Sequence, residues 1–453
     1  MYPEKVMIQE AEKCSRCGVC AAVCPVFREL QRETYSSRGK TEIAKALVAG
    51  ELPYSSYTED IFSKCLLCLT CKGACPAGVD QGKLILGIRA ELAKRRGLPL
   101  SKKIAFKYLL KNRSLFEKAL KAFSYLQMFA PPKGDGQLRH LPFFLSAFGK
   151  RRLIPDLSKT PLRKEFPEVI PPSKGPAQLR VGLFSGCFID FVDPAIGRSL
   201  IRVLGRHGVE VVFPKKQTCC GIPVFMSGDL QNGLDLLKMN IEAFAPYKLD
   251  AIIVACATCG SALKESYKTL VEGESQEWKD RVGAFSGKIL DIAEFLTQKI
   301  KLSPLTLPLS PANGGEGGGE GEGKKGNSYT IKLTKAEKEP LQKVTYHDPC
   351  HLNRGQGVLS QPRQVLKNLP GITLVEMRDP QRCCGGGGSF SFYNYDLSQQ
   401  ISRQKVEDIQ ATKASVVVTG CPGCMLQLKD QLGQKNSQVE VKHLIQLVDE
   451  AGS

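Results

Sequence analysis

The segment CSRCGVCAAVCP, residues 14–25, shows the cysteine spacing around which the rest of the chain can be interpreted. Its four cysteines are separated by two, two and three residues, and a proline follows the fourth. The segment CLLCLTCKGACP, residues 65–76, repeats both the spacing and the proline. Three thiols at i, i+3 and i+6 in a tight loop can hold one metal cluster, whereas the fourth, before the proline, points the other way. We therefore predict that clusters organise the N-terminal part of the chain.

Both segments resemble bacterial two-cluster ferredoxins, in which the fourth cysteine of each run ligates the other cluster. The alternatives are two zinc sites, which usually use isolated cysteine pairs, or a disulfide framework, which needs an oxidising compartment. The resemblance implies two 4Fe-4S clusters with crossed ligands. The first set is Cys14, Cys17, Cys20 and Cys75. The second set is Cys65, Cys68, Cys71 and Cys24.

The other ten of the 18 cysteines form two copies of a longer motif, C-x31-CC-x35-C-x2-C and C-x32-CC-x36-C-x2-C. Nearly equal gaps in two complete copies indicate a duplicated module and not ten independent core residues. The first copy contains Cys187, Cys219, Cys220, Cys256 and Cys259. The second contains Cys350, Cys383, Cys384, Cys421 and Cys424.

Each cysteine group follows a short apolar segment typical of a strand, and helical segments separate these strands. In the first copy the strands are LRVGLFSG, VEVVFP and DAIIVA, and in the second VTYHDP, ITLVEM and ASVVVTG. Strands that alternate with helices predict a parallel sheet, whose carboxyl ends share one edge. The five thiols of each copy are therefore expected to converge on one pocket.

The motifs TCCGIP (218–223), RCCGGGGSF (382–390), HDPCHL (347–352) and GCPGCMLQL (420–428) resemble the CCG domains of heterodisulfide reductases and of iron–sulfur subunits of flavin-linked dehydrogenases. With the two ferredoxin runs, the arrangement resembles the iron–sulfur subunits of glycolate oxidase and D-lactate dehydrogenase. SRGK, residues 37–40, is the counterpart of a turn found in these relatives. The resemblance implies one or two further clusters, with cubane, non-cubane and zinc centres all left open.

Glycines follow both cysteine pairs, at position 221 and at positions 385–388. A backbone without side chains lets N–H groups approach cluster sulfurs, whereas a phosphate loop would need spaced glycines and a downstream acid. His347 and His351 flank Cys350. They could donate to the cluster or relay protons, but the sequence favours hydrogen-bonded structural histidines.

The fold class expected is multidomain α/β: an α-helical two-cluster domain and then two parallel-sheet CCG domains. The predicted division of the 453 residues is a ferredoxin-like domain at 1–97, a basic helical connector at 98–176, CCG domains at 177–300 and 331–453, and a flexible linker at 301–330. In the linker, eight of the sixteen residues 311–326 are glycine, which excludes a packed core there.

The net charge of +18 is concentrated in the connector, where 20 Lys and Arg stand against 5 Asp and Glu between Lys94 and Arg180. Two amphipathic helices with a capping box at Ser114 and Glu117 are expected here. Their basic faces are either solvated or dock an acidic protein or an anionic membrane. A nucleic-acid partner is not expected, because no known binding module is present. The candidate docking residues are Lys102, Lys103, Lys107, Lys111, Arg151 and Arg152.

We expect an electron-transfer subunit of an oxidoreductase that acts on CH–OH donors. A partner FAD subunit would oxidise glycolate or D-lactate, since no flavin or nicotinamide fingerprint is present. Electrons would pass to a quinone or another carrier, with a quinone reductase as a further candidate partner. No catalytic residue is assigned. The alternatives are a disulfide-cleaving enzyme and a structural metal scaffold. Without a signal peptide or a spanning apolar run, a cytoplasmic protein is expected, with attachment to the inner face of the cell membrane as a further option.

Overall fold

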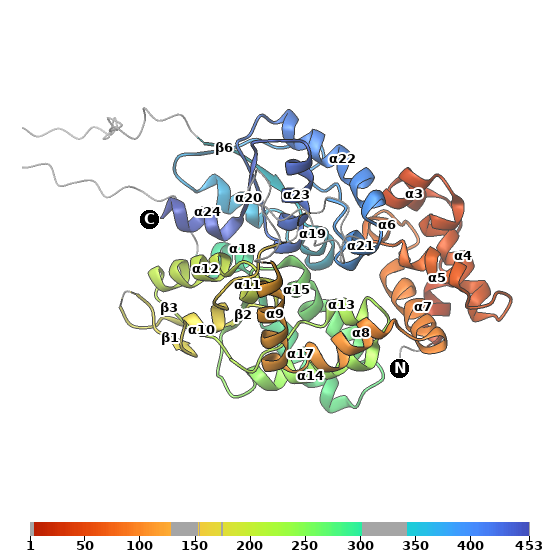
Figure 1. Ribbon diagram of the computed structural model, residues 1–453, viewed down its shortest axis with the longest axis horizontal. Helices are drawn as coiled ribbons and strands as arrows, with labels where there is room; N and C mark the ends of the chain where they lie inside the picture. Colours follow the sequence, from red (N-terminus) through yellow and green to blue (C-terminus); the bar gives the residue numbers. More distant parts are fainter. Residues whose placement is uncertain (1–3, 128–152, 154, 174, 301–341, 453) are drawn as a thin grey trace, which may run out of the picture.

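The computed structural model describes residues 4–127, 153, 155–173, 175–300 and 342–452 (Figure 1). The predicted linker and two candidate docking residues, Arg151 and Arg152, lie outside the described residues. The described chain forms a helical N-terminal domain and two α/β units, which confirms the predicted fold class.

The N-terminal domain contains α-helices joined by the two cysteine loops. Ser36 begins one of its longer helices by accepting a hydrogen bond from the Gly39 N–H at 2.8 Å, and Asp80 begins another by accepting one from Lys83. The apolar faces of these helices bury Phe62, Leu84 and other residues in one core. The helices are α1 (Glu4–Glu12), α2 (Val19–Ala22), α3 (Pro25–Leu30), α4 (Ser37–Val48), α5 (Ser56–Ser63), α6 (Thr70–Gly73) and α7 (Gln81–Arg96), with a 3-10 turn at Glu33–Tyr35.

The first α/β unit has a five-stranded sheet in the order β1-β3-β2-β4-β5. Its strands are parallel except β1, which pairs antiparallel with β3. β2 and β4 carry nearly continuous apolar runs because helices cover both faces of the sheet. The strands are β1 (Val169–Ile170), β2 (Leu179–Phe184), β3 (Val209–Val212), β4 (Ala251–Val254) and β5 (Ile289–Asp291).

The helices of the first unit alternate with its strands. The two long helices α12 and α14 follow β2 and β3, and each begins after an aspartate, Asp193 or Asp229. The helices are α10 (Leu162–Glu165), α11 (Phe188–Phe191), α12 (Pro194–Arg206), α13 (Ile222–Phe225), α14 (Leu230–Phe244), α15 (Ala257–Ser261), α16 (Tyr267–Leu270), α17 (Gln276–Gly287) and α18 (Ile292–Phe295), with π-helical turns at Ala262–Ser266 and Leu296–Ile300.

The second α/β unit repeats this order around a parallel sheet, β7-β6-β8-β9. The strands are β6 (Gln342–His347), β7 (Ile372–Leu374), β8 (Val416–Thr419) and β9 (Glu440–His443). The helices are α19 (Cys350–Gln356), α20 (Gln361–Lys367), α21 (Ser389–Tyr393), α22 (Tyr395–Ala411), α23 (Pro422–Gln434) and α24 (Leu444–Ala451). β1, β5 and β9 were not predicted from the sequence, and β1 lies within the segment predicted as the helical connector.

The two units share one hydrophobic core. α15 packs against α19 and α12 against α24, and Arg206 on α12 pairs with Asp449 on α24 at 2.9 Å. The Ala257 N–H also donates to the Gly420 carbonyl at 3.1 Å, just where the cysteine segments of both units begin. The cysteine edges of the two sheets therefore face one another (Figure 1).

The connector packs against the first unit through α8 (Leu100–Ile104), a π-helical turn (Ala105–Leu109) and α9 (Arg113–Gln127). Phe106 is buried with two residues of that unit, and Lys111 pairs with Asp235 at 2.5 Å. The predicted capping box at Ser114 and Glu117 is wrong. The helix begins two residues earlier than a Ser114 cap implies, because the Asn112 side chain accepts the Leu115 N–H at 3.0 Å.

Candidate metal centres

The two cysteine loops of the N-terminal domain have the same backbone turn. Arg16 and Gly18 in the first loop, and Leu67 and Leu69 at the equivalent places in the second, all have positive φ values between 51° and 85°. Two leucines in this left-handed region are strained, because their Cβ atoms crowd the backbone. The shared turn curls each loop so that its thiols face inward.

The loops enclose two adjoining cavities. One is lined by Cys24, Cys65, Cys68 and Cys71, which is the second predicted ligand set. The other is lined by the first predicted set, Cys14, Cys17, Cys20 and Cys75, and also by Cys71. The structure thus brings together the cysteines that crossed ligation requires, with Cys71 between the two cavities.

The SRGK turn closes the cavity that contains Cys24 and Cys65. Lys40 lines this cavity, is 2% exposed, and donates to the Tyr35 carbonyl. Burial lowers the pKa of Lys40, while the nearby thiols oppose that shift. Gly39 permits the turn, because a Cβ atom there would lie 2.0 Å from the Glu33 carbonyl oxygen. A buried ammonium group beside the thiols favours anionic sulfur in this cavity.

In the first α/β unit, the predicted cysteines converge at the carboxyl edge of the sheet. The Cys187 thiol contacts that of Cys219, and the Cys220 thiol contacts that of Cys259. Cys256 contacts Cys259, which completes the group. The hydrogen bond from Cys219 lowers the pKa of Cys220 to about 6, whereas contact with Cys220 and burial raise that of Cys259.

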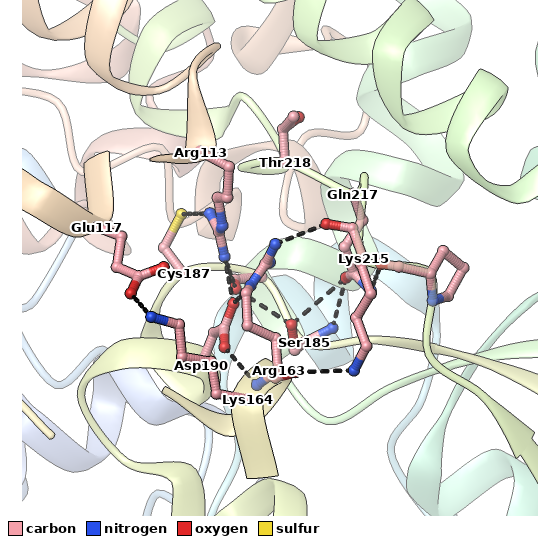
Figure 2. Close-up of polar contacts among 12 residues, drawn as sticks. Arg113, Glu117, Arg163, Lys164, Ser185, Cys187, Asp190, Lys215, Gln217 and Thr218 are labelled. Carbon is pink, nitrogen blue, oxygen red and sulfur yellow. Dashed lines mark hydrogen bonds and ion pairs between the residues drawn. The ribbon is translucent and has the colours of Figure 1, made fainter. Parts of the chain in front are cut away.

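Arg113 of the connector reaches the same group (Figure 2). Its guanidinium donates to Cys187 Sγ at 3.4 Å, to the Gly186 carbonyl at 3.0 Å and to Asp190 Oδ2 at 2.6 Å. Arg163 donates to the same Asp190 oxygen at 2.6 Å. Two guanidinium groups against one fully buried carboxylate leave a net positive charge beside Cys187.

In the second α/β unit, contacts join Cys383 to Cys384, Cys384 to Cys424, and Cys424 to Cys421. The Gly385 N–H donates to Cys383 Sγ at 3.4 Å. Gly385 has φ 80°, and a Cβ atom there would lie 2.5 Å from the Ser398 carbonyl oxygen. The glycine after the cysteine pair is therefore required for this approach of backbone to sulfur. Cys350 is half-buried at the start of α19.

The two predicted histidines differ. His351 contacts the Leu67 carbonyl through Nε2 at 3.0 Å and so fits the structural role favoured from the sequence. His347 does not fit that role: within the described part of the chain neither of its ring nitrogens has a hydrogen-bond partner. Burial lowers the pKa of His347 to about 3, so the imidazole is neutral. One ring nitrogen and the Sγ atoms of Cys384 and Cys424 lie within 4.8 Å of one another.

Thiol contacts also connect cysteines of different domains. The Cys68 thiol of the N-terminal domain contacts that of Cys383 in the second unit, and this contact, together with burial, raises the pKa of Cys68. The Cys256 thiol of the first unit contacts that of Cys421 in the second. The second unit therefore lies between the N-terminal domain and the first unit in the order of sulfur contacts.

The donor set fits metal centres. All 18 cysteines are free thiols, and most of those in the α/β units are buried in contact with one another. Burial raises the pKa of a thiol, as it does for Cys71 and Cys350. Metal ions are the usual means of stabilising grouped thiolates in such surroundings. A buried histidine with unused nitrogens beside two of these sulfurs points the same way.

Comparisons with known proteins agree with this geometry. Residues 10–79 match the family described as a 4Fe-4S dicluster domain, and residues 181–264 and 344–429 each match the cysteine-rich CCG domain. The probable glycolate oxidase iron-sulfur subunit of Bacillus subtilis is 30% identical over 99% of this chain and 96% of its own length. The chain belongs to the family of glycolate oxidase iron–sulfur subunits.

Other similar proteins carry different names. A dihydromethanophenazine:CoB–CoM heterodisulfide reductase subunit of Methanosarcina acetivorans is 26% identical over 98% of this chain and 95% of its own length. Lactate utilization protein A 2 of Bacillus cereus is 27% identical over 60% of this chain and 98% of its length. In the described part of the chain, no helix is long and apolar enough to cross a membrane.

Proposed function

We propose that the chain is the electron-transfer subunit of a flavin-linked 2-hydroxy-acid dehydrogenase, with glycolate or D-lactate oxidised on a separate FAD subunit. Iron–sulfur clusters, when bound, accept and release single electrons. The relatives named for glycolate oxidase and lactate utilisation support the class of substrate.

The observation that carries the proposal is the unbroken order of sulfur contacts. It runs from the N-terminal cavities through Cys68 and Cys383 to the second α/β unit, and through Cys421 and Cys256 to the first. A structural scaffold would not need to place four separate donor sets in contact. We propose this order as the route of electrons between the FAD subunit and the acceptor.

This chain supplies ligands and their immediate surroundings. We propose that Cys14, Cys17, Cys20 and Cys75 hold one 4Fe-4S cluster, and Cys24, Cys65, Cys68 and Cys71 hold the second, as the cavities support. The two five-cysteine groups would each hold one further centre. Arg113 and Lys40 hold positive charge next to these ligands.

The connector is proposed to dock the FAD subunit. Among the described residues, it exposes Leu100, Ile104 and Tyr108 beside lysines, with Leu100 72% exposed. Lys111 and Lys102 are partly engaged within the protein, by Asp235 and by the Tyr393 ring at 4.6 Å. A mixed apolar and basic face suits a partner with an apolar patch rimmed by carboxylates.

The test uses the chain purified anaerobically in complex with a candidate FAD subunit. Addition of glycolate or D-lactate should bleach the cluster absorbance in the full complex, and the chain alone with either substrate should show no change. A complex that oxidises substrate while the cluster absorbance of an iron-loaded chain stays constant would refute the proposal.

A disulfide reductase is the second candidate, because both α/β units retain all five cysteines and a heterodisulfide reductase subunit is similar over nearly the full length. The chain, reduced with dithionite and freed of reductant, would then convert an added mixed disulfide to two thiols without an FAD subunit. Thiol release by the wild type, absent from Cys384→Ser, would favour this candidate over the first.

A further inference from the structure

His347 marks a chemical difference between the two α/β units. It is the last residue of β6, three residues before Cys350. The equivalent place in the first unit, three residues before Cys187, is Phe184 at the end of β2. Phe184 is fully buried and stacks on Phe244 with ring centroids 6.2 Å apart. The same backbone position thus carries an apolar ring in one unit and an imidazole in the other.

A buried imidazole normally has hydrogen-bond partners, since an unsatisfied polar group costs free energy. His347 is 1% exposed, and in the described part of the chain neither ring nitrogen has one. Two charged groups that act on His347, Asp348 and Lys405, have other partners. Asp348 accepts from Arg363 at 2.8 and 3.0 Å, and Lys405 donates to the Asp379 and Pro380 carbonyls at 2.6 and 3.1 Å.

The nitrogen instead faces sulfur. This nitrogen and the Sγ atoms of Cys384 and Cys424 lie within 4.8 Å of one another, close enough for a group that could hold one metal ion. Metal–sulfur bonds of about 2.3 Å and metal–nitrogen bonds of about 2.1 Å place tetrahedral ligands roughly 3.5–3.8 Å apart. A shift of about 1 Å or less in these side chains would satisfy that geometry. The cysteine motif alone gave no sign of a nitrogen ligand.

We propose that the imidazole of His347 is a ligand, with Cys384 and Cys424, of the metal centre in the second α/β unit. This inference rests on the proposed function, in which that unit holds an iron centre. The second unit then has mixed sulfur and nitrogen ligands, whereas the first, with Phe184, has sulfur ligands alone. Replacement of thiolate by neutral imidazole raises the reduction potential of an iron–sulfur centre, so the two units differ in potential.

The experiment is pulsed EPR on the reduced, iron-loaded chain in which histidine is labelled with 15N. The variants are His347→Phe, which copies the first unit, and His347→Gln, which keeps a polar side chain. His207→Gln is the matched control. His207 follows the last residue of α12, and no predicted metal ligand lies in that helix. We expect strong coupling to a histidine nitrogen in the wild type and the control, lost in both His347 variants.

Absence of a strong histidine coupling in the wild type, or its survival in His347→Phe, would overturn the assignment. Iron analysis of Cys384→Ser separates this result from failure of the proposed function. If Cys384→Ser loses iron and the wild type shows no histidine coupling, the second unit binds metal but His347 is not a ligand. Iron content and EPR signals identical in Cys384→Ser and wild type would refute metal binding by the second unit, and the inference with it.

Discussion

Replacement of Arg113 by glutamine should lower the reduction potential of the centre in the first α/β unit. The Arg113 guanidinium donates to Cys187 Sγ at 3.4 Å and shares Asp190 with Arg163. With both arginines the group has a net charge of +1, and without Arg113 it is neutral. A positive charge stabilises the reduced, more negative form of a centre, so its loss favours the oxidised form.

The size of the shift follows from the distance. The charge on Arg113 lies about 7 Å from an added electron. This distance combines the 3.4 Å contact with Cys187 Sγ, a metal–sulfur bond of about 2.3 Å and part of the centre itself. At an effective dielectric constant of about 20, unit charges at that distance interact by roughly 2.4 kcal/mol. Since about 1.4 kcal/mol corresponds to about 59 mV for one electron, we expect a decrease of about 100 mV.

The assay is an EPR-monitored redox titration of the iron-loaded chain. Lys111→Gln is the matched control, because Lys111 lies in the same connector and pairs with Asp235 but contacts no thiol. Arg113→Lys retains the charge and should recover most of the potential. Equal midpoint potentials in Arg113→Gln and Lys111→Gln, with equal iron content, would refute the electrostatic argument.

Three further predictions concern other parts of the molecule. Cys68→Ser should remove the N-terminal cluster that it ligates and also perturb the EPR signal of the second unit, because its thiol contacts Cys383; an unaltered second-unit signal would contradict this contact. Gly39→Ala should destabilise the N-terminal domain by about 1–3 kcal/mol in denaturant unfolding, since the added Cβ would lie 2.0 Å from the Glu33 carbonyl oxygen; unchanged stability would show that the turn can move. Burial raises the pKa of Asp291 to about 7. The folded state therefore keeps a proton that the unfolded state loses above about pH 4, so the free energy of unfolding falls as pH rises from about 4 to 7. Asp291→Asn should flatten that dependence in thermal unfolding, and an identical slope in the variant would rule out Asp291 as its source.

The predicted strands were those with continuous apolar residues, and the structure contains each of them. β1, β5 and β9 escaped prediction because each is a short edge strand with few buried residues. β9, with the sequence EVKH, needs just two buried residues, and these give too little periodicity to identify a strand. The edge strand β7 was predicted nonetheless, because it lies in the longer apolar segment ITLVEM.

The environment of the cysteines was less predictable than the cysteines themselves. Arg113 lies 74 residues before Cys187, and its basic segment predicted docking to a partner and not contact with a thiol. The hydrogen-bonded role favoured for His347 was reasonable for a histidine near a strand end, and it is wrong because the surrounding acceptors are occupied. Such roles depend on what the neighbours already bind, and no local spacing encodes that.

The order of the units in space differs from their order in the sequence, and this has a functional consequence. Cys68 contacts the second α/β unit, so the first unit, although it follows the N-terminal domain along the chain, is the farther one in the series of sulfur contacts. The connector, which carries the proposed docking face, packs on that farther unit and places Arg113 against Cys187. The same connector begins beside the N-terminal end of the series, where Lys102 and Cys65 line one cavity, so a partner bound along it would span both ends of the series.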